Sequence, residues 1–129
     1  MEHLNQLDDP EVLCHGDYHI ENVMVADTWR VIDWTNAYSG NPLSDVARSM
    51  MILESPVIFK HRKWYERSII RMMMKVIKRH YLRAYGISSR KLRKWRPIVL
   101  AARLNEGISV EKTWLLSQLF KELKQQGIE

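Results

Sequence analysis

The chain has 129 residues, of which 46% are apolar and 27% are charged. This length and composition suit one globular domain with its own core, and they exclude a disordered or fibrous chain. No apolar run approaches the roughly 18 to 20 residues that span a bilayer, and the start is polar and acidic, so we expect a cytoplasmic protein without a membrane segment. The single cysteine, Cys14, excludes an internal disulfide and, by itself, a structural zinc site.

The net charge of +5 conceals an uneven distribution along the chain. Residues 1–59 carry a net charge of −8, residues 60–96 carry +13, and the remaining residues are neutral overall. Chemistry that needs carboxylates must therefore come from the first part, whereas the second part is basic and helix-prone.

Three short segments rich in Val, Ile, Met and Trp predict strands in the acidic part. They span residues 11–14, 22–26 and 29–34. Asp27 and Thr28 form a connection short enough for a hairpin between the second and third segments. Residues 35–41 are typical of a loop that leads into a helix, because Asn41 can cap that helix and Pro42 suits its first position.

Amphipathic spacing and turn residues divide the rest of the chain into helices. The predicted helices span residues 42–53, 57–85, 88–104 and 109–126. Ser55 and Pro56 repeat the cap-then-proline start before the second helix, and Pro97 is expected to break or kink the third. Gly86 should end the second helix, and Ser109 should cap the last.

One group of polar residues in the acidic part has the chemistry of phosphoryl transfer. His15, Gly16 and Asp17 are followed by Asn22 and, at the end of the next apolar run, by Asp33. A loop aspartate can accept the proton of a hydroxyl nucleophile, while an amide oxygen and a second carboxylate suit Mg²⁺. Phosphoryl transfer needs both functions. A hairpin between Asn22 and Asp33 would bring both side chains towards one point.

The segments HGDYHIENVM and VIDW resemble the catalytic and metal-binding loops of the aminoglycoside phosphotransferase and choline kinase family, which is distantly related to protein kinases. The resemblance implies that Asp17 is the catalytic base. It implies that Asn22 and Asp33 bind Mg²⁺ and, through it, ATP or GTP. His15 would shape the loop, and Asp45 in the following GNPLSDVARSM would tie that loop to the first helix.

The same resemblance implies a fold that is mainly α with a small β-hairpin (α+β), the carboxy-terminal lobe of a kinase-like phosphotransferase. We expect one domain over residues 1–129, with the loops and hairpin in 11–41 and the helical part in 42–127. The family places a nucleotide-binding lobe before the motif, whereas fourteen residues precede His15 here. We therefore expect a truncated chain that is weak or inactive by itself and self-associates through the surface left by the missing lobe.

The implied reaction transfers phosphate from ATP or GTP to a hydroxyl of a small metabolite or antibiotic. In the aminoglycoside enzymes an acidic pocket formed by the carboxy-terminal helices holds the polycationic drug. The corresponding helices here are basic or neutral, which favours a neutral or anionic acceptor.

Two other interpretations compete with these assignments. His15 and His19 are four residues apart and could bind zinc, but no third ligand is evident. The basic residues of 60–96 are interleaved with aromatic residues, which would suit a non-catalytic binding module or remnant that uses this helix for nucleic acid or an acidic partner. Their regular spacing instead favours a solvated helix face, with Met72, Met73 and Val76 packed into the core, so we do not expect nucleic-acid binding.

Overall fold

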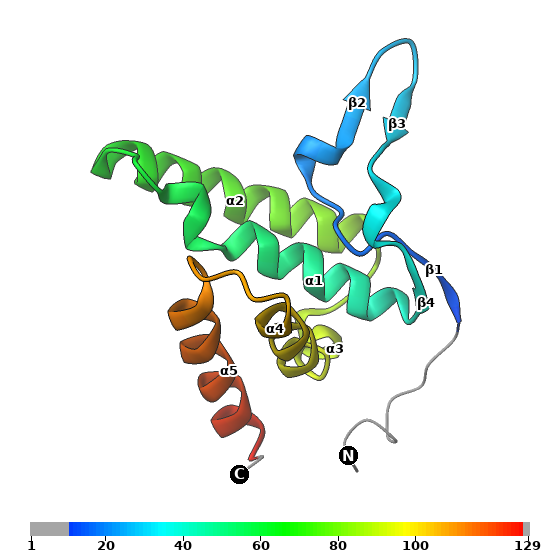
Figure 1. Ribbon diagram of the computed structural model, residues 1–129. Coiled ribbons are helices and arrows are strands. Elements are labelled where there is room, and N and C mark those ends of the chain that lie inside the picture. Colours follow the sequence, from blue (N-terminus) through cyan, green and yellow to red (C-terminus); the bar gives the residue numbers. More distant parts are fainter. Residues whose placement is uncertain (1–10, 128–129) are drawn as a thin grey trace.

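Helix α1 (Pro42–Glu54) lies at the centre of the computed structural model, which describes residues 11–127 (Figure 1). It supplies half of the buried apolar side chains, because its neighbours cover it from several directions. The α1 contribution to the core cluster is Val46, Ala47, Met50, Met51 and Leu53, and the carboxy-terminal part of the chain contributes Leu92, Trp95, Val99, Leu100 and Leu115. The core therefore lies between α1 and the carboxy-terminal helices.

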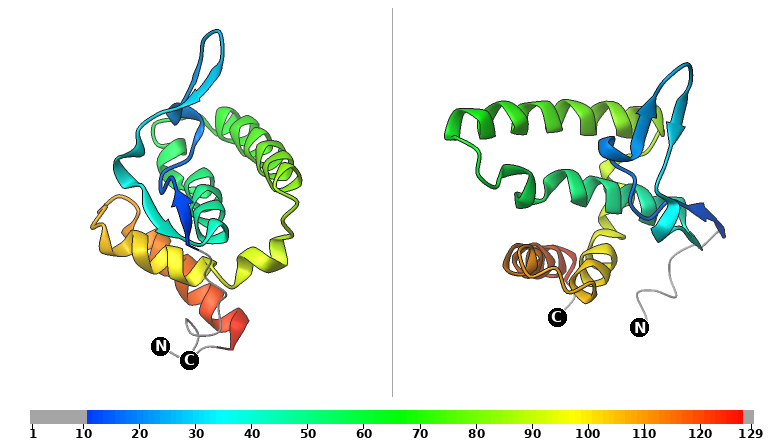
Figure 2. Two further views of the ribbon diagram at one scale, coloured as in Figure 1. Left: turned by 90° about the vertical axis from the view of Figure 1, so that its right-hand side faces the viewer. Right: turned by 45° about the horizontal axis from the view of Figure 1, so that its top comes forward.

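Four further α-helices surround α1. They are α2 (Trp64–Ala84), α3 (Ser89–Arg93), α4 (Arg96–Asn105) and α5 (Lys112–Gln126). Helix α2 runs along one side of α1, whereas α4 and α5 lie on the other side (Figure 2). Arg96 links these layers, since it donates hydrogen bonds to Glu54 of α1 at 2.9 Å and to Glu122 of α5 at 2.6 Å.

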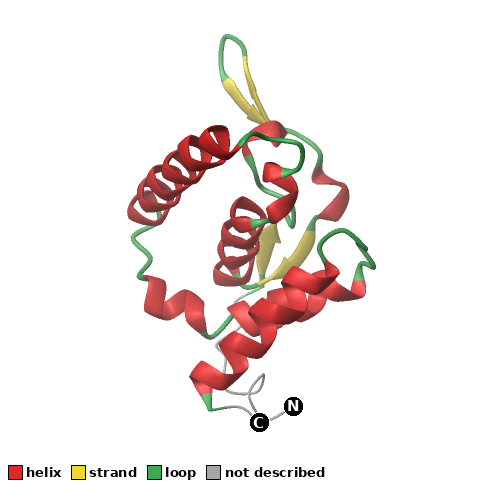
Figure 3. Cartoon of the chain, turned by 90° about the vertical axis from the view of Figure 1, so that its left-hand side faces the viewer, coloured by secondary structure: helices red, strands yellow, loops and turns green. Residues whose placement is uncertain are grey.

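The strands form two separate antiparallel pairs (Figure 3). Strand β1 (Val12–Cys14) pairs with β4 (Tyr38–Gly40), and β2 (Val23–Val25) pairs with β3 (Trp29–Val31) in a hairpin that projects from the helical body. Among the described residues the chain also forms the 3₁₀ helices η2 (Ile20–Asn22), η3 (Trp34–Asn36) and η4 (Pro56–Phe59). The predicted fold class, mainly α with a small β-hairpin, is confirmed.

The starts of α1 and η4 follow the predicted capping chemistry, whereas the predicted Ser109 cap of the last helix is wrong, because Glu111 takes the cap position of α5 and makes no side-chain capping hydrogen bond. Asn41 Oδ1 accepts a hydrogen bond from the amide of Leu43 at 2.8 Å, and Ser55 Oγ accepts one from the amide of Val57 at 3.2 Å. Pro97 lies in the first turn of α4, so the segment predicted as one helix over 88–104 is two helices, with a break before the proline.

Three predicted boundaries are wrong. Residues 35–41 contain β4, which a loop assignment missed. The helix predicted from residue 57 begins at Trp64, because the chain first forms η4 and His61 then takes a left-handed conformation (φ 64°) that interrupts the helix. The last helix begins at Lys112 rather than at Ser109.

The predicted core role of Met72, Met73 and Val76 is also wrong. Their exposed fractions are 63%, 52% and 51%. Helix α2 packs instead through a different stripe, formed by the partly buried side chains Met74, Ile77, Tyr81 and Leu82. The reason is that α2 has helical neighbours on one side only, so its outward face has nothing to pack against (Figure 2).

Within residues 11–127, no helix combines the length and the apolar character that crossing a membrane requires. The hairpin nevertheless presents apolar side chains to solvent, with Val25 and Trp29 at 64% and 77% exposure. This agrees with an apolar surface beside the predicted catalytic loop, and self-association through it stays a prediction.

Candidate active site

The predicted catalytic loop begins where β1 ends, and its course depends on Gly16. This residue has a positive φ of 78°, which glycine adopts without strain. A Cβ at this position would lie 2.1 Å from the carbonyl oxygen of Asn36 in η3. The loop therefore lies against η3 in an arrangement that only glycine permits.

Helix α1 holds the backbone of this loop with two side chains spaced one turn apart. The Asp45 carboxylate accepts hydrogen bonds from the amides of His15 at 2.9 Å and Gly16 at 2.8 Å. Arg48 donates from Nε to the carbonyl oxygen of Gly16. The sequence analysis missed Arg48, although its position three residues after Asp45 places it on the same face of the helix.

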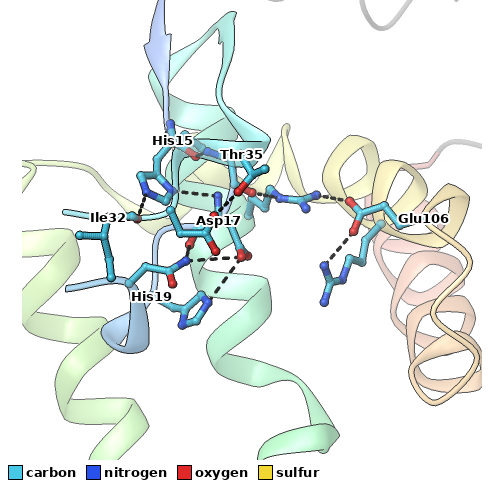
Figure 4. A network of polar contacts seen from close by, with 12 residues as sticks. His15, Asp17, His19, Ile32, Thr35 and Glu106 are labelled. Carbon is cyan, nitrogen blue, oxygen red and sulfur yellow. Dashed lines mark hydrogen bonds and ion pairs between the residues drawn. The ribbon is translucent and has the colours of Figure 1, made fainter. Parts of the chain in front are cut away.

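The His15 side chain connects the first loop to the end of the hairpin. Its Nδ1 accepts a hydrogen bond from the Asp17 amide at 3.2 Å, and its Nε2 lies 2.9 Å from the carbonyl oxygen of Ile32 (Figure 4). These partners require a neutral ring that carries its proton on Nε2. Because both ring nitrogens are occupied, this geometry argues against zinc binding by His15 and His19.

Asn22 holds Asp17 from the other end of the loop. Its Nδ2 donates to the carbonyl oxygen of Asp17 at 2.8 Å and lies 3.5 Å from Asp17 Oδ2. His19 Nε2 is also 3.5 Å from the same carboxylate oxygen. Asn22 is 7% exposed, whereas the side chain of Asp17 is 24% exposed. The amide is thus a buried support and the carboxylate is accessible to a ligand.

Asp33 follows Ile32, which is the backbone hydrogen-bond partner of Asn22. The amide of Ile32 donates to the Asn22 carbonyl oxygen at 2.9 Å and so extends the β2–β3 ladder to this point. Asp33 then takes a left-handed conformation (φ 59°), and the Thr35 hydroxyl donates to its Oδ1. Within residues 11–127, no hydrogen bond joins the Asp33 carboxylate to Asp17 or Asn22. The structure therefore brings Asp17 and Asn22 into contact, whereas Asp33 is linked to them only through the backbone of its neighbour Ile32.

The donor set fits Mg²⁺ that is shared with substrate phosphates. No group of three or more His, Cys, Asp or Glu side chains in the described part of the chain could hold a metal by itself. Magnesium in nucleotide-dependent enzymes is usually held by one or two protein oxygens together with phosphates. Asn22 directs its nitrogen to Asp17, which leaves its amide oxygen available, and Asp33 retains one carboxylate oxygen beyond its bond to Thr35.

A cavity of about 460 Å³ opens beside Asp17. The loop, α1, η4 and the helices around them all contribute to its lining. The lining residues are Asp17, His19, Ile20, Glu21, Ile52, Leu53, Ser55, Val57, Ile58, Arg62, Met74, Arg103 and Glu111. A second cavity, of about 440 Å³, is lined by Gly16 and Arg48 but not by Asp17, and Asn22 and Asp33 line neither of the two cavities. The first cavity is therefore the one in which a bound hydroxyl compound would meet the Asp17 carboxylate.

A row of alternating charges connects the loop to the wall of the 460 Å³ cavity. Glu106 contacts Arg48 at 2.7 Å and Arg103 at 2.8 Å (Figure 4). Arg103 also contacts the buried Glu111 at 2.9 Å. Glu111 also accepts a hydrogen bond from the Ser55 hydroxyl. Burial raises the pKa of Glu106, but Arg48 and Arg103 outweigh it and hold this pKa below the ordinary value of 4.5.

A family model now adds an independent observation to this geometry. Residues 1–68 match the model of the phosphotransferase enzyme family, which is more than half of the chain. The chain belongs to this family. The match confirms the predicted relationship to aminoglycoside phosphotransferases, and it includes the whole candidate site from His15 to Asp45. Neither the curated proteins nor the solved structures contain a significant match to this phosphotransferase family member.

Proposed function

We propose that this chain carries the catalytic residues for transfer of the γ-phosphate of ATP or GTP to a hydroxyl of a small molecule. The proposal rests on the position of Asp17, whose carboxylate faces the 460 Å³ cavity. Asn22 Nδ2 lies 3.5 Å from this carboxylate and donates to the Asp17 carbonyl oxygen at 2.8 Å. A proton acceptor and an oxygen donor for a cation thus lie together, and Asp33 follows Ile32, whose amide donates to the Asn22 carbonyl oxygen. Membership of the phosphotransferase family supports the reaction class.

In this proposal Asp17 orients the acceptor hydroxyl and takes its proton as the phosphoryl group moves to the oxygen. The residue is suited to this role because its backbone is fixed from two sides. Its amide donates to His15 Nδ1 and its carbonyl oxygen accepts from Asn22 Nδ2. Such fixation matters because phosphoryl transfer depends on the positioning of the nucleophile more than on covalent chemistry.

Asn22 and Asp33 would hold Mg²⁺ through the amide oxygen and the carboxylate. When bound, the cation neutralises charge on the phosphate oxygens. The contribution of the chain is to fix these two donors. Asn22 is buried and pinned through its nitrogen to Asp17, and Asp33 is restrained by Thr35.

The 460 Å³ cavity beside Asp17 suits a small hydroxyl compound with an apolar body. Six of its thirteen lining residues are apolar, and the buried Glu111 is paired with Arg103. The other charges of the lining are Asp17 and Glu21 against Arg62, which is not the strongly acidic pocket that a polycation requires. A small neutral hydroxyl compound fits this environment better than an aminoglycoside.

The test combines metal binding with turnover. Mn²⁺ with ATP or GTP, added to isotopically labelled protein, should broaden the NMR signals of Asn22 and Asp33, and Asp33→Asn should remove most of this effect. Because we expect the chain alone to be weak or inactive, turnover is followed with a radioactive γ-phosphate that detects slow transfer. Any transfer to a panel of hydroxyl compounds should be lost in Asp17→Asn but retained in Asp27→Asn, an exposed carboxylate at the tip of the hairpin. Broadening elsewhere in the chain, or turnover that survives Asp17→Asn, would refute the assignment.

A further inference from the structure

The outward face of α2 carries a continuous apolar stripe. Tyr65, Ile69, Met72 and Val76 follow one another at spacings of four, three and four residues, and Met73 lies beside them. Their exposed fractions range from 43% for Tyr65 to 63% for Met72. This spacing places the side chains on one seam of a helix and is the pattern with which one helix packs against another. We call these five residues the α2 stripe.

Two cations, Lys75 and Arg79, stand at one edge of the α2 stripe in the second half of the helix. They continue a series with Arg67 and Arg71 at every fourth residue, but such a series winds around a helix of 3.6 residues per turn, so Arg67 and Arg71 are turned away from the stripe. Arg67 Nε donates to the Arg62 carbonyl oxygen, and the Arg71 guanidinium lies 5.3 Å from the ring centre of Phe59. Neither Lys75 nor Arg79 forms an ion pair with a carboxylate in the described residues 11–127. We call Lys75 and Arg79 the basic row.

The basic row borders an open groove of about 700 Å³ between the second half of α2 and the start of α3. Lys75, Lys78, Arg79 and Arg83 line this groove together with Leu82, Ile87 and the segment Gly86, Ser88 and Ser89, and no acidic residue is among them. Lys78 is already paired with Glu54. The groove thus offers room for side chains of negative charge at the edge of the α2 stripe.

We propose that α2 docks an acidic amphipathic helix of another protein. The apolar residues of that helix, at three- and four-residue spacing, pack along the α2 stripe, and its carboxylates on one edge face the basic row and enter the groove. Burial of the apolar seam supplies most of the affinity, and the row of opposite charges fixes the orientation and selects acidic over basic partners.

The structure disfavours the other ligands that a basic helix attracts. Nucleic acid needs exposed aromatic side chains beside phosphate-binding cations. Trp64 and Tyr65 at the start of α2 and Tyr85 after its end are exposed, but the face between them carries aliphatic side chains, on which bases do not stack. An anionic membrane suits cations on both edges of an apolar stripe, whereas the opposite edge begins with Glu66.

A second copy of α2 is disfavoured by charge. Pairing of two α2 stripes would bring two basic rows to the same interface, and like charges across an interface oppose association. The α2 stripe and the basic row also lie almost wholly beyond residue 68, where the family match ends. The proposed docking surface is therefore independent of the proposed phosphoryl transfer.

The experiment uses the full chain and two synthetic amphipathic helices of three heptads each. Both peptides carry leucine at the seam positions, and the flanking positions are glutamate in one and lysine in the other. Isothermal titration should give saturable one-to-one binding of the glutamate peptide that weakens with salt, and at least tenfold weaker binding of the lysine peptide.

Two double variants separate the contributions, with circular dichroism to verify the fold of each. Lys75→Glu with Arg79→Glu should weaken binding of the glutamate peptide about tenfold and strengthen binding of the lysine peptide. Ile69→Ser with Met72→Ser should weaken binding of both peptides. The matched control, Arg90→Glu with Lys91→Glu, reverses two exposed cations on α3 and should leave both affinities unchanged.

Several results would overturn the proposal. Equal affinity for the two peptides would do so, and so would peptide affinities that are unchanged in the double variant Ile69→Ser with Met72→Ser. Tighter binding of phosphatidylserine vesicles or of single-stranded RNA, lost in Lys75→Glu with Arg79→Glu, would assign the face to a membrane or to nucleic acid. A concentration-dependent dimer in sedimentation experiments, abolished by Ile69→Ser, would assign it to a second copy of the chain.

Discussion

The Asp45 carboxylate and the Gly16 amide are joined by a 2.8 Å hydrogen bond, although 29 residues separate them in the chain. The second oxygen of Asp45 accepts from His15 at 2.9 Å. One carboxylate in the first turn of α1 therefore satisfies two successive amides of the loop that presents Asp17. The orientation of that loop depends on where α1 begins, and this start is set by the Asn41 cap and Pro42.

The first prediction concerns this carboxylate. Asp45→Asn replaces one acceptor oxygen with a donor, so at least one loop amide loses its partner. Hydrogen bonds to charged groups contribute roughly 1.5–3 kcal/mol, and we expect the free energy of unfolding to fall by about 2 kcal/mol. Urea denaturation measures this change, and amide hydrogen exchange should accelerate at His15 and Gly16. Asp27→Asn is the exposed control, and an equal loss in that variant would contradict the prediction.

The second prediction concerns Gly16. Gly16→Ala adds a Cβ that would lie 2.1 Å from the Asn36 carbonyl oxygen, at a positive φ that already disfavours alanine. We expect a loss of about 3 kcal/mol or more, since conformational strain and a backbone clash add together. Gly86→Ala provides the comparison, because Gly86 has φ 64° but open space at the Cβ position. Its loss should be only about 1 kcal/mol. Similar losses in both variants would show that the contact with Asn36 is unimportant.

The third prediction concerns acid stability through Glu54. Burial raises the pKa of this carboxyl, but hydrogen bonds and charge from Arg96 and Lys78 outweigh burial and lower the pKa below its ordinary value of 4.5. A lowered pKa in the folded state gives stability that is complete above pH 4.5 and is lost as the pH falls through the folded value. Glu54→Gln should therefore flatten the dependence of unfolding free energy on pH in this acid range. An unchanged slope would remove Glu54 as its source.

The fourth prediction concerns the buried pair of Glu111 and Arg103. Arg103→Leu leaves Glu111, 3% exposed, without its cation. Loss of one member of a buried pair costs roughly 3–5 kcal/mol, and we expect a value near the lower end because the Ser55 hydroxyl still donates to Glu111. The double variant with Glu111→Leu should recover most of the loss, as thermal and urea unfolding can measure. A double variant less stable than Arg103→Leu would contradict this.

The sequence predicts the local parts of this structure well. The capping roles of Asn41 and Ser55, the hairpin and the break near Pro97 all depend on neighbouring residues, so spacing and residue type suffice to locate them. The residues of the candidate site could be predicted for the same reason, since Asp17, Asn22 and Asp33 occur within one short segment. Their roles in catalysis and metal binding stay predictions.

The features that the sequence did not reveal depend on distant pairing. Strand β4 exists because Gly40 pairs with Val12, and no periodicity in residues 35–41 indicates it. Arg48, Glu106 and Arg103 form a row only because α1 and α4 pack side by side. The exposure of Met72 was missed because an amphipathic pattern shows that a helix has an apolar side, but not how many neighbours cover it.

The pairing of Cys14 with Tyr38 places the beginning and the end of the segment that carries the predicted site next to each other. The first part of this segment stays bound to α1 through Asp45, whereas the hairpin projects from the body and carries the turn at Ala26, Asp27 and Thr28 at its far end. A fluorescent reporter or a small inserted tag at that turn would affect a local contact, the hydrogen bond from the Ala26 amide to the Thr28 carbonyl oxygen, and would leave the contacts between the loop and α1 in place. The turn is thus a suitable attachment point for a label that reports ligand binding at the candidate site.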